Sequence, residues 1–290
     1  MRSASHEANL GAVRDLTFQG VNALHHGQVD QAATLLQQAV QASPDDQRIR
    51  QHLADAMVQQ GRVDAAIQQL QAAIESSPHD PRLYVELGTL HLSRNQPETA
   101  LVCAESALKI NRQLPCAWVL HGQCKESTRD LHAALASFHR AAALPDVSPD
   151  VQINIAQTYR SMDRPMQALN ALELFTENYA TDQIPESTVL LMADTLVDLK
   201  QTDRATEQLA QLTRRHDATP EAWLALSRIQ SATGGTATAL MTAQDASQLF
   251  PQDQRLIAWT NELSSQLDRP DRRTAGLPGE RSGSDGFSYK

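Results

Sequence analysis

The chain has 290 residues, which is enough to bury a sizeable core, and its formal net charge at pH 7 is -9. Aromatic residues are only 4% of the chain, and the abundance of Ala, Leu and Gln favours helix over strand. An acidic chain without a basic stripe makes nucleic acid an unexpected partner, because neutralised phosphates supply most of that affinity. No window approaches the run of about 18 apolar residues that a membrane span needs, so direct membrane insertion is not expected.

The first twenty residues contain several charged side chains and no apolar run, which is not the pattern of a secretory signal peptide. We expect residues 1–12 to be a leader that is partly disordered or forms the start of the first helix. The three cysteines are odd in number and lack the spacing of a disulfide framework, which favours reduced thiols. A cytoplasmic location is therefore predicted.

A repeat with a period of 34 residues runs through the chain. Gly27 and Gly61 are 34 residues apart, as are Pro44 and Pro78. Repeat units are predicted to start at residues 13, 47, 81, 115, 149, 186 and 220, with a three-residue insertion at 183–185.

Two places in each unit hold small residues. The twentieth place is alanine in all seven units: Ala32, Ala66, Ala100, Ala134, Ala168, Ala205 and Ala239. The eighth place is Gly, Ala or Ser throughout: Gly20, Ala54, Gly88, Gly122, Ala156, Ala193 and Ser227. Such columns indicate a close approach of two paired helices, since a larger side chain would force their backbones apart.

The remaining pattern fits two helices joined by a turn. Large apolar residues at the fourth and seventh places share a face with the eighth place, as on an amphipathic helix. Gly27, Gly61, Asn95 and Gly234 fall between the two helices, where a chain often needs a left-handed residue.

The chain resembles the tetratricopeptide repeat family over about residues 13 to 253. The family pattern is an aromatic, Leu-Gly, an aromatic, Ala, an aromatic or Leu, Ala and Pro. It is met at five of its places by Trp223, Leu226, Ala239, Ala246 and Pro251, and almost as well by Tyr84, Leu87, Gly88, Ala100 and Ala107. The resemblance implies an all-α fold, a right-handed superhelical solenoid of helix-turn-helix repeats over residues 13–268. The chain departs from the family pattern at Gln19, Arg50, His121 and Lys125.

Residues 254–268 are expected to form a capping helix that covers the last apolar face, and residues 269–290 a disordered tail. The stripe expected to be buried is Leu256, Trp259, Leu263 and Leu267.

The resemblance implies a binding groove on the concave face, with the second, fifth, sixth, ninth, twelfth and thirteenth places contributing. The fifth place is apolar from the third unit onward: Val85, Val119, Ile153, Leu190 and Leu224. This row either docks a peptide or partner helix, or packs against the neighbouring helix. The second place holds Arg14, Arg48 and Arg82, which either meet an anionic partner segment or are solvated surface charge.

Asn154 is a further candidate partner-binding residue, because it is the only asparagine at a place matching the family members that grip the acidic tails of chaperones. No three consecutive units reproduce that pattern, nor is there the asparagine ladder of the sugar-transferring relatives.

No catalytic motif is present, so the chain is not expected to be an enzyme and no cofactor is expected. A zinc site is a weak alternative. Its ligands would come from His91, Cys103, Cys116, His121 and Cys124, but the spacing of these residues along the chain matches no known zinc finger.

The sequence thus predicts a scaffold or adaptor that binds a peptide or helix of a partner protein in the groove. Two alternatives remain: a structural subunit of a larger membrane-associated or secretion assembly, and a regulatory module of a separately encoded enzyme.

Overall fold

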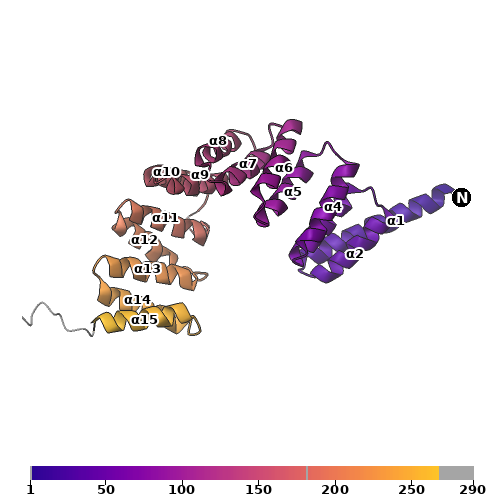
Figure 1. Ribbon diagram of the computed structural model, residues 1–290. Coiled ribbons are helices and arrows are strands. Elements are labelled where there is room, and N and C mark those ends of the chain that lie inside the picture. Colours follow the sequence, from indigo (N-terminus) through magenta and orange to yellow (C-terminus); the bar gives the residue numbers. More distant parts are fainter. Residues whose placement is uncertain (1, 181, 268–290) are drawn as a thin grey trace, which may run out of the picture. The chain divides into compact units, whose positions relative to one another are not determined.

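The computed structural model describes residues 2–180 and 182–267, and this part of the chain is built of helices without strands (Figure 1). The helices in chain order are α1 (Arg2–His25), α2 (Val29–Ala42), α3 (Gln47–Gln59), α4 (Val63–Ser76), α5 (Pro81–Ser93), α6 (Pro97–Ile110), α7 (Pro115–Ser127), α8 (Leu131–Ala142), α9 (Val151–Ser161), α10 (Pro165–Thr176), α11 (Glu186–Asp198), α12 (Thr202–Leu212), α13 (Pro220–Ala232), α14 (Thr236–Leu249) and α15 (Gln254–Leu267). The protein is an all-α repeat solenoid in which odd-numbered helices open a repeat and even-numbered helices close it. α15 follows the last pair.

Helix starts are set by local chemistry. The Asp46 carboxylate accepts hydrogen bonds from the backbone N–H groups of Arg48 and Ile49, at 2.9 and 3.3 Å, and so caps α3. Asp80 caps α5 in the same way, and Pro81 occupies the first turn, where its missing N–H costs nothing.

The turn between the paired helices has a left-handed residue at the same place in every repeat. Gly27, Gly61, Asn95 and Gly234 have positive φ as the sequence predicts. The structure adds Arg129, Asp163 and Lys200, with φ of 63°, 58° and 59°. Residue type did not reveal these three, because the geometry of the turn imposes the conformation on whichever residue stands there.

The two columns of small residues lie where the paired helices touch. All seven alanines of the twentieth place are 0% exposed. A Cβ added at Gly122 would lie 2.5 Å from the Phe138 ring, and one added at Gly20 would lie 2.7 Å from the Leu36 side chain. Small residues recur here because the partner helix already fills the space.

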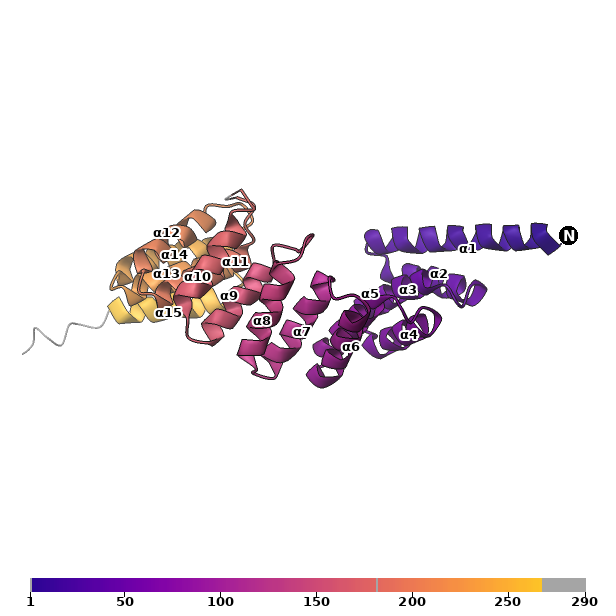
Figure 2. The same cartoon turned by 90° about the horizontal axis from the view of Figure 1, so that it is seen from above.

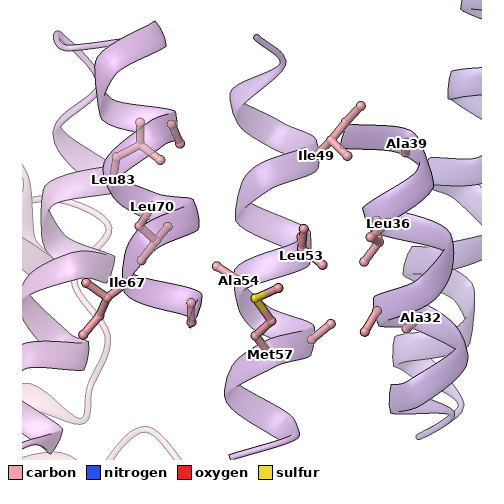
Figure 3. Packing of buried hydrophobic residues seen from close by; sticks show 14 of the residues in the cluster. Ala32, Leu36, Ala39, Ile49, Leu53, Ala54, Met57, Ile67, Leu70 and Leu83 are labelled. Carbon is pink, nitrogen blue, oxygen red and sulfur yellow. The ribbon is translucent and has the colours of Figure 1, made fainter. Parts of the chain in front are cut away.

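The core runs along the stack rather than around one centre. In Figure 3, Leu53 and Met57 of α3 lie with Leu36 of α2 on one side and with Leu70 and Leu83 on the other. α3 therefore buries residues against both the preceding and the following helices, as expected when a repeat contacts its neighbours.

The chain divides into two compact units, residues 1–179 and 180–290. The division falls beside the predicted insertion at 183–185. Within the first unit the helices α1 to α10 follow one another in pairs, and within the second α11 to α15 do the same (Figures 1 and 2).

α15 packs on the last pair of the second unit. Leu256 and Leu263 are 0% exposed, and Trp259 contacts both of their clusters. Leu267 was expected in the same stripe, but this is wrong: it is the last residue of α15 and is 47% exposed. The predicted tail 269–290 lies outside the described residues, and the predicted leader is part of α1 from Arg2 onward.

Candidate partner-binding groove

A hollow of about 560 Å³ is lined by the opening helices α1, α3 and α5 of the first unit and by one residue of α4. Its apolar lining consists of Val21, Leu24, Ala54, Val58, Leu70, Val85 and Leu90, and its polar lining of His25, His52, Asp55, Gln59, Glu86 and Thr89. Mostly apolar walls with a few convergent polar groups are typical of binding sites.

A second hollow of about 490 Å³ continues the first, since Val21 and His52 line both. α1 contributes Leu10, Val13, Arg14, Thr17, Phe18 and Val21, a spacing that places them on one helical face. The Phe18 ring is 72% exposed and Leu10 is 54% exposed. We call the two hollows together the N-terminal groove.

The two ends of the N-terminal groove carry opposite charge. Arg14 and Arg48 line the hollow beside Phe18 and outnumber the single carboxylate of Asp46 there, whereas Asp55 and Glu86 line the other hollow. Burial raises the pKa of both carboxyl groups; His52 opposes the rise at Asp55, and the hydrogen bond from Gln51 opposes it at Glu86. A hydrogen-bonding or positively charged partner group would relieve this penalty.

Glu86 is held in place by the neighbouring repeat. The amide Nε2 of Gln51 on α3 donates to Glu86 Oε1 on α5 at 3.0 Å. The carboxylate is therefore oriented before any partner arrives, which reduces the entropy lost on binding.

A further hollow of about 680 Å³ is lined by α5, α7 and α9 and the loops beside them. Arg82, Cys116, Val119, Asp150 and Asn154 are among its lining residues. We call it the middle hollow.

The predicted site residues are divided among these places. Arg14 and Arg48 line the N-terminal groove with Val85, whereas Arg82, Val119 and Asn154 line the middle hollow. Arg82 thus lies in a different hollow from the other two arginines.

The other members of the predicted apolar row line neither the N-terminal groove nor the middle hollow. Ile153 on α9 and Leu190 on α11 are half-buried. Leu224 is 2% exposed and packs with Ala246 and Leu256, which for this residue favours the alternative of packing against a neighbouring helix. The capping helix covers the last repeat, so its fifth place becomes core.

Sequence reasoning missed Phe18, Asp55 and Glu86. They occupy the sixth, ninth and sixth places of their units, which are among the places that the family resemblance marks as groove-lining. The signal was therefore available, but only the second and fifth places were followed.

The suggested zinc ligands do not converge. His121 bonds to Ser137 and His91 to Gln96, while Cys116 is exposed and lines the middle hollow. Burial and the neighbouring Cys103 raise the pKa of Cys124 to about 11, so its thiol stays protonated. Within the part of the chain that the structure describes, no three His, Cys, Asp or Glu side chains are grouped to hold a metal ion.

No helix within residues 2–180 and 182–267 combines the length and apolar character needed to cross a membrane.

Stacked helical hairpins that touch through small residues and expose a groove define an α-solenoid of the protein-binding class. Models of the tetratricopeptide repeat match residues 23–84, 59–124 and 190–253, together more than half of the chain. The chain belongs to the tetratricopeptide repeat family.

Solved structures share this fold at low sequence identity. A tetratricopeptide repeat protein from Parabacteroides merdae is 12% identical, with a TM-score of 0.63 over 88% of this chain and 99% of its own. Pseudomonas aeruginosa pilF is 17% identical, with a TM-score of 0.62 over 78% and 99%. PilW, described as a widely conserved type IV pilus biogenesis factor, is 16% identical, with a TM-score of 0.64 over 71% and 94%.

A search of curated protein sequences finds no match. The low identities mean that the structural likeness establishes the fold alone.

Proposed function

We propose that this protein is a scaffold or adaptor that binds a peptide segment or helix of a partner protein in the N-terminal groove. One observation carries the proposal: Phe18, 72% exposed, lies in an apolar groove whose ends carry opposite charge. A large exposed aromatic side chain in a concave apolar surface is typical of a protein contact, where such residues dominate the binding energy.

The groove favours a particular kind of partner segment. Apolar anchors would pack on Phe18 and Val21, as in recognition of an amphipathic helix. An acidic side chain would pair with Arg14 and Arg48. At the other end, a hydrogen-bond donor or cation would meet Asp55 and Glu86.

Selection from a random peptide library tests the proposal. We expect the selected peptides to carry apolar anchors with an acidic residue on one side and a basic residue on the other. Phe18→Ala should weaken binding of the best peptide by tenfold or more, about 1.4 kcal/mol or greater. The control is Val102→Ala, because Val102 is 62% exposed on α6 and lies outside the groove.

Charge reversal separates the two ends of the groove. Arg14→Glu together with Arg48→Glu should abolish the preference for an acidic residue and leave the basic one. Peptides that bind the wild type and both groove variants equally would refute the proposal.

The same proposal includes a purely binding role without catalysis, and a cytoplasmic location. Free thiols support the cytoplasmic location: Cys103 and Cys124 are buried and form no disulfide with each other, which suits a reducing compartment. Fractionation of cells with an antibody to the native protein tests the location.

A second candidate is a structural subunit of a membrane-associated or secretion assembly. Met241 and Leu249 on α14 favour it, since they are 64% and 60% exposed and eight residues apart on one helical face. The fold likeness to pilF and PilW suggests the class of assembly. Co-sedimentation with membranes that survives Phe18→Ala but is lost in Met241→Gln with Leu249→Gln would favour this role.

A further inference from the structure

A hollow of about 540 Å³ lies among α6, α7 and α8 and shares no lining residue with the N-terminal groove or the middle hollow. Lys109, Arg112 and Arg140 line it, opposed by the single carboxylate of Glu105. We call it the basic hollow. Three cations gathered in one concavity are unusual in a chain whose net charge is -9.

These cations are available to a ligand. The side chains of Lys109, Arg112 and Arg140 are exposed, and no carboxylate within the described residues lies at salt-bridge distance from any of them. With Glu105 counted, the lining has a surplus of two positive charges. An anion that enters would therefore bind without first breaking an ion pair.

Trp118 organises two of the three cations. The Arg140 guanidinium carbon lies 4.7 Å from the centroid of the Trp118 ring, a cation–π contact that restricts the arginine. The indole Nε1–H donates to the carbonyl oxygen of Arg112 at 2.9 Å and so fixes the turn after α6. One aromatic side chain thus positions both guanidinium-bearing residues.

His121 forms part of the wall in a defined protonation pattern. The Ser137 hydroxyl donates to the Ala133 carbonyl at 2.7 Å, so its oxygen accepts from His121 Nδ1 at 2.9 Å. Burial lowers the pKa of His121, Lys125 and Arg140 lower it further, and Glu105 opposes them. The ring is therefore neutral at pH 7 and does not add to the positive charge.

We propose that the basic hollow binds a phosphate monoester, with Arg112 and Arg140 contacting the phosphoryl oxygens and Lys109 supplying the third charge. A phosphate monoester carries a charge of about -1.5 to -2 at pH 7, which matches the surplus of two, whereas a carboxylate carries one. Planar guanidinium groups bind phosphate through paired hydrogen bonds. The apolar side chains of Leu108 and Ala136 lie in the same wall and suit the carbon part of an ester.

The ester has two sources with the same chemistry: a phosphorylated side chain of a partner protein, or a free phosphorylated small molecule. Calorimetry on the full chain distinguishes them with three probes: phenyl phosphate, inorganic phosphate and a phosphoserine peptide. Benzoate is the monoanion of matched shape. Tighter binding of the peptide than of phenyl phosphate indicates a partner side chain, and the reverse indicates a free ester.

Three variants test the site. Arg140→Gln should weaken phenyl phosphate binding tenfold or more, and Ala136→Leu should do the same by filling the hollow without changing charge. Arg228→Gln is the matched control, because Arg228 lies over Trp259 at 5.9 Å outside the hollow, and it should bind as the wild type does. Circular dichroism checks that each variant is folded.

Three outcomes would overturn the proposal. Phenyl phosphate fails to bind the wild type at millimolar concentration, benzoate binds as tightly as phenyl phosphate, or Arg228→Gln weakens binding as much as Arg140→Gln. As an independent readout, the indole N–H signal of Trp118 should shift on titration, while those of Trp223 and Trp259 should not.

Discussion

Trp259 on the capping helix donates its indole N–H to the hydroxyl oxygen of Ser227 on α13, over 2.8 Å. The Ser227 hydroxyl donates in turn to the carbonyl oxygen of Ala239 on α14, at 2.7 Å. One buried hydroxyl therefore links the last repeat pair to the helix that closes the second unit.

Ser227→Ala should lower the free energy of unfolding of the second unit by about 1–3 kcal/mol, because the Trp259 N–H loses its acceptor in a largely buried place. The substitution leaves no steric problem, since alanine stands at the same place in other repeats. Urea unfolding followed by tryptophan fluorescence measures the loss. Ser265→Ala is the control, because its hydroxyl bonds only to a carbonyl one turn away at the surface. Equal losses in the two variants would contradict the role given to Ser227.

Lys200→Gly should stabilise the protein by about 0.5–1 kcal/mol. Lys200 has a φ of 59°, where an L side chain is strained by about 1–2 kcal/mol and glycine is not, although glycine loses more chain entropy. Gly61→Ala, at the equivalent turn with a φ of 74°, should change stability in the opposite direction. Thermal unfolding of both variants gives the signs, and two shifts of the same sign would refute the explanation.

Ala134→Leu should destabilise the first unit by about 1–3 kcal/mol through overpacking, since Ala134 is 0% exposed. Ala136→Leu on the same helix is the control: Ala136 is exposed, so a larger side chain meets no packed helix. Chemical denaturation of both variants measures the difference. A stabilised Ala134→Leu protein would show that this place is not a helix contact.

Glu86→Gln should stabilise the first unit at pH 7 but not at pH 4. Burial raises the pKa of Glu86 above its ordinary value of 4.5, so the ionised form costs free energy in the folded state. That cost is present above the raised folded pKa and disappears as the pH falls below the ordinary value. Glutamine keeps a hydrogen-bond acceptor for Gln51 and carries no charge.

Melting temperatures at the two pH values check this expectation. The control is Glu207→Gln, an exposed carboxylate on α12. A gain for Glu86→Gln that is equal at pH 4 and pH 7 would contradict the ionisation argument.

The repeat and its close helix contacts could be predicted from residue order. A column such as Ala32 to Ala239 is visible because every repeat must place a small residue where its own two helices touch, and that requirement is local. The left-handed turn was predicted where glycine or asparagine stood and missed at Arg129 and Lys200, whose side chains carry no sign of it.

Whether a side chain stays exposed on the surface depends on the helices that pack against its repeat. Leu224 has the same place in its repeat as Val85, yet it is buried, because a capping helix follows its repeat and not another open pair. The basic hollow joins Lys109 of α6, Arg112 of the turn after it and Arg140 of α8, at spacings unrelated to the 34-residue period.

Thus the order of residues alone determined the helical pairs, their period and the family, since these follow from contacts within a repeat and between adjacent repeats. Only the tertiary structure decided which side chains stay exposed, where the N-terminal groove and the basic hollow lie, and that the chain divides near residue 180. Exposure is decided by what packs against a residue from other repeats, and a periodic pattern is the same whether or not that neighbour is present.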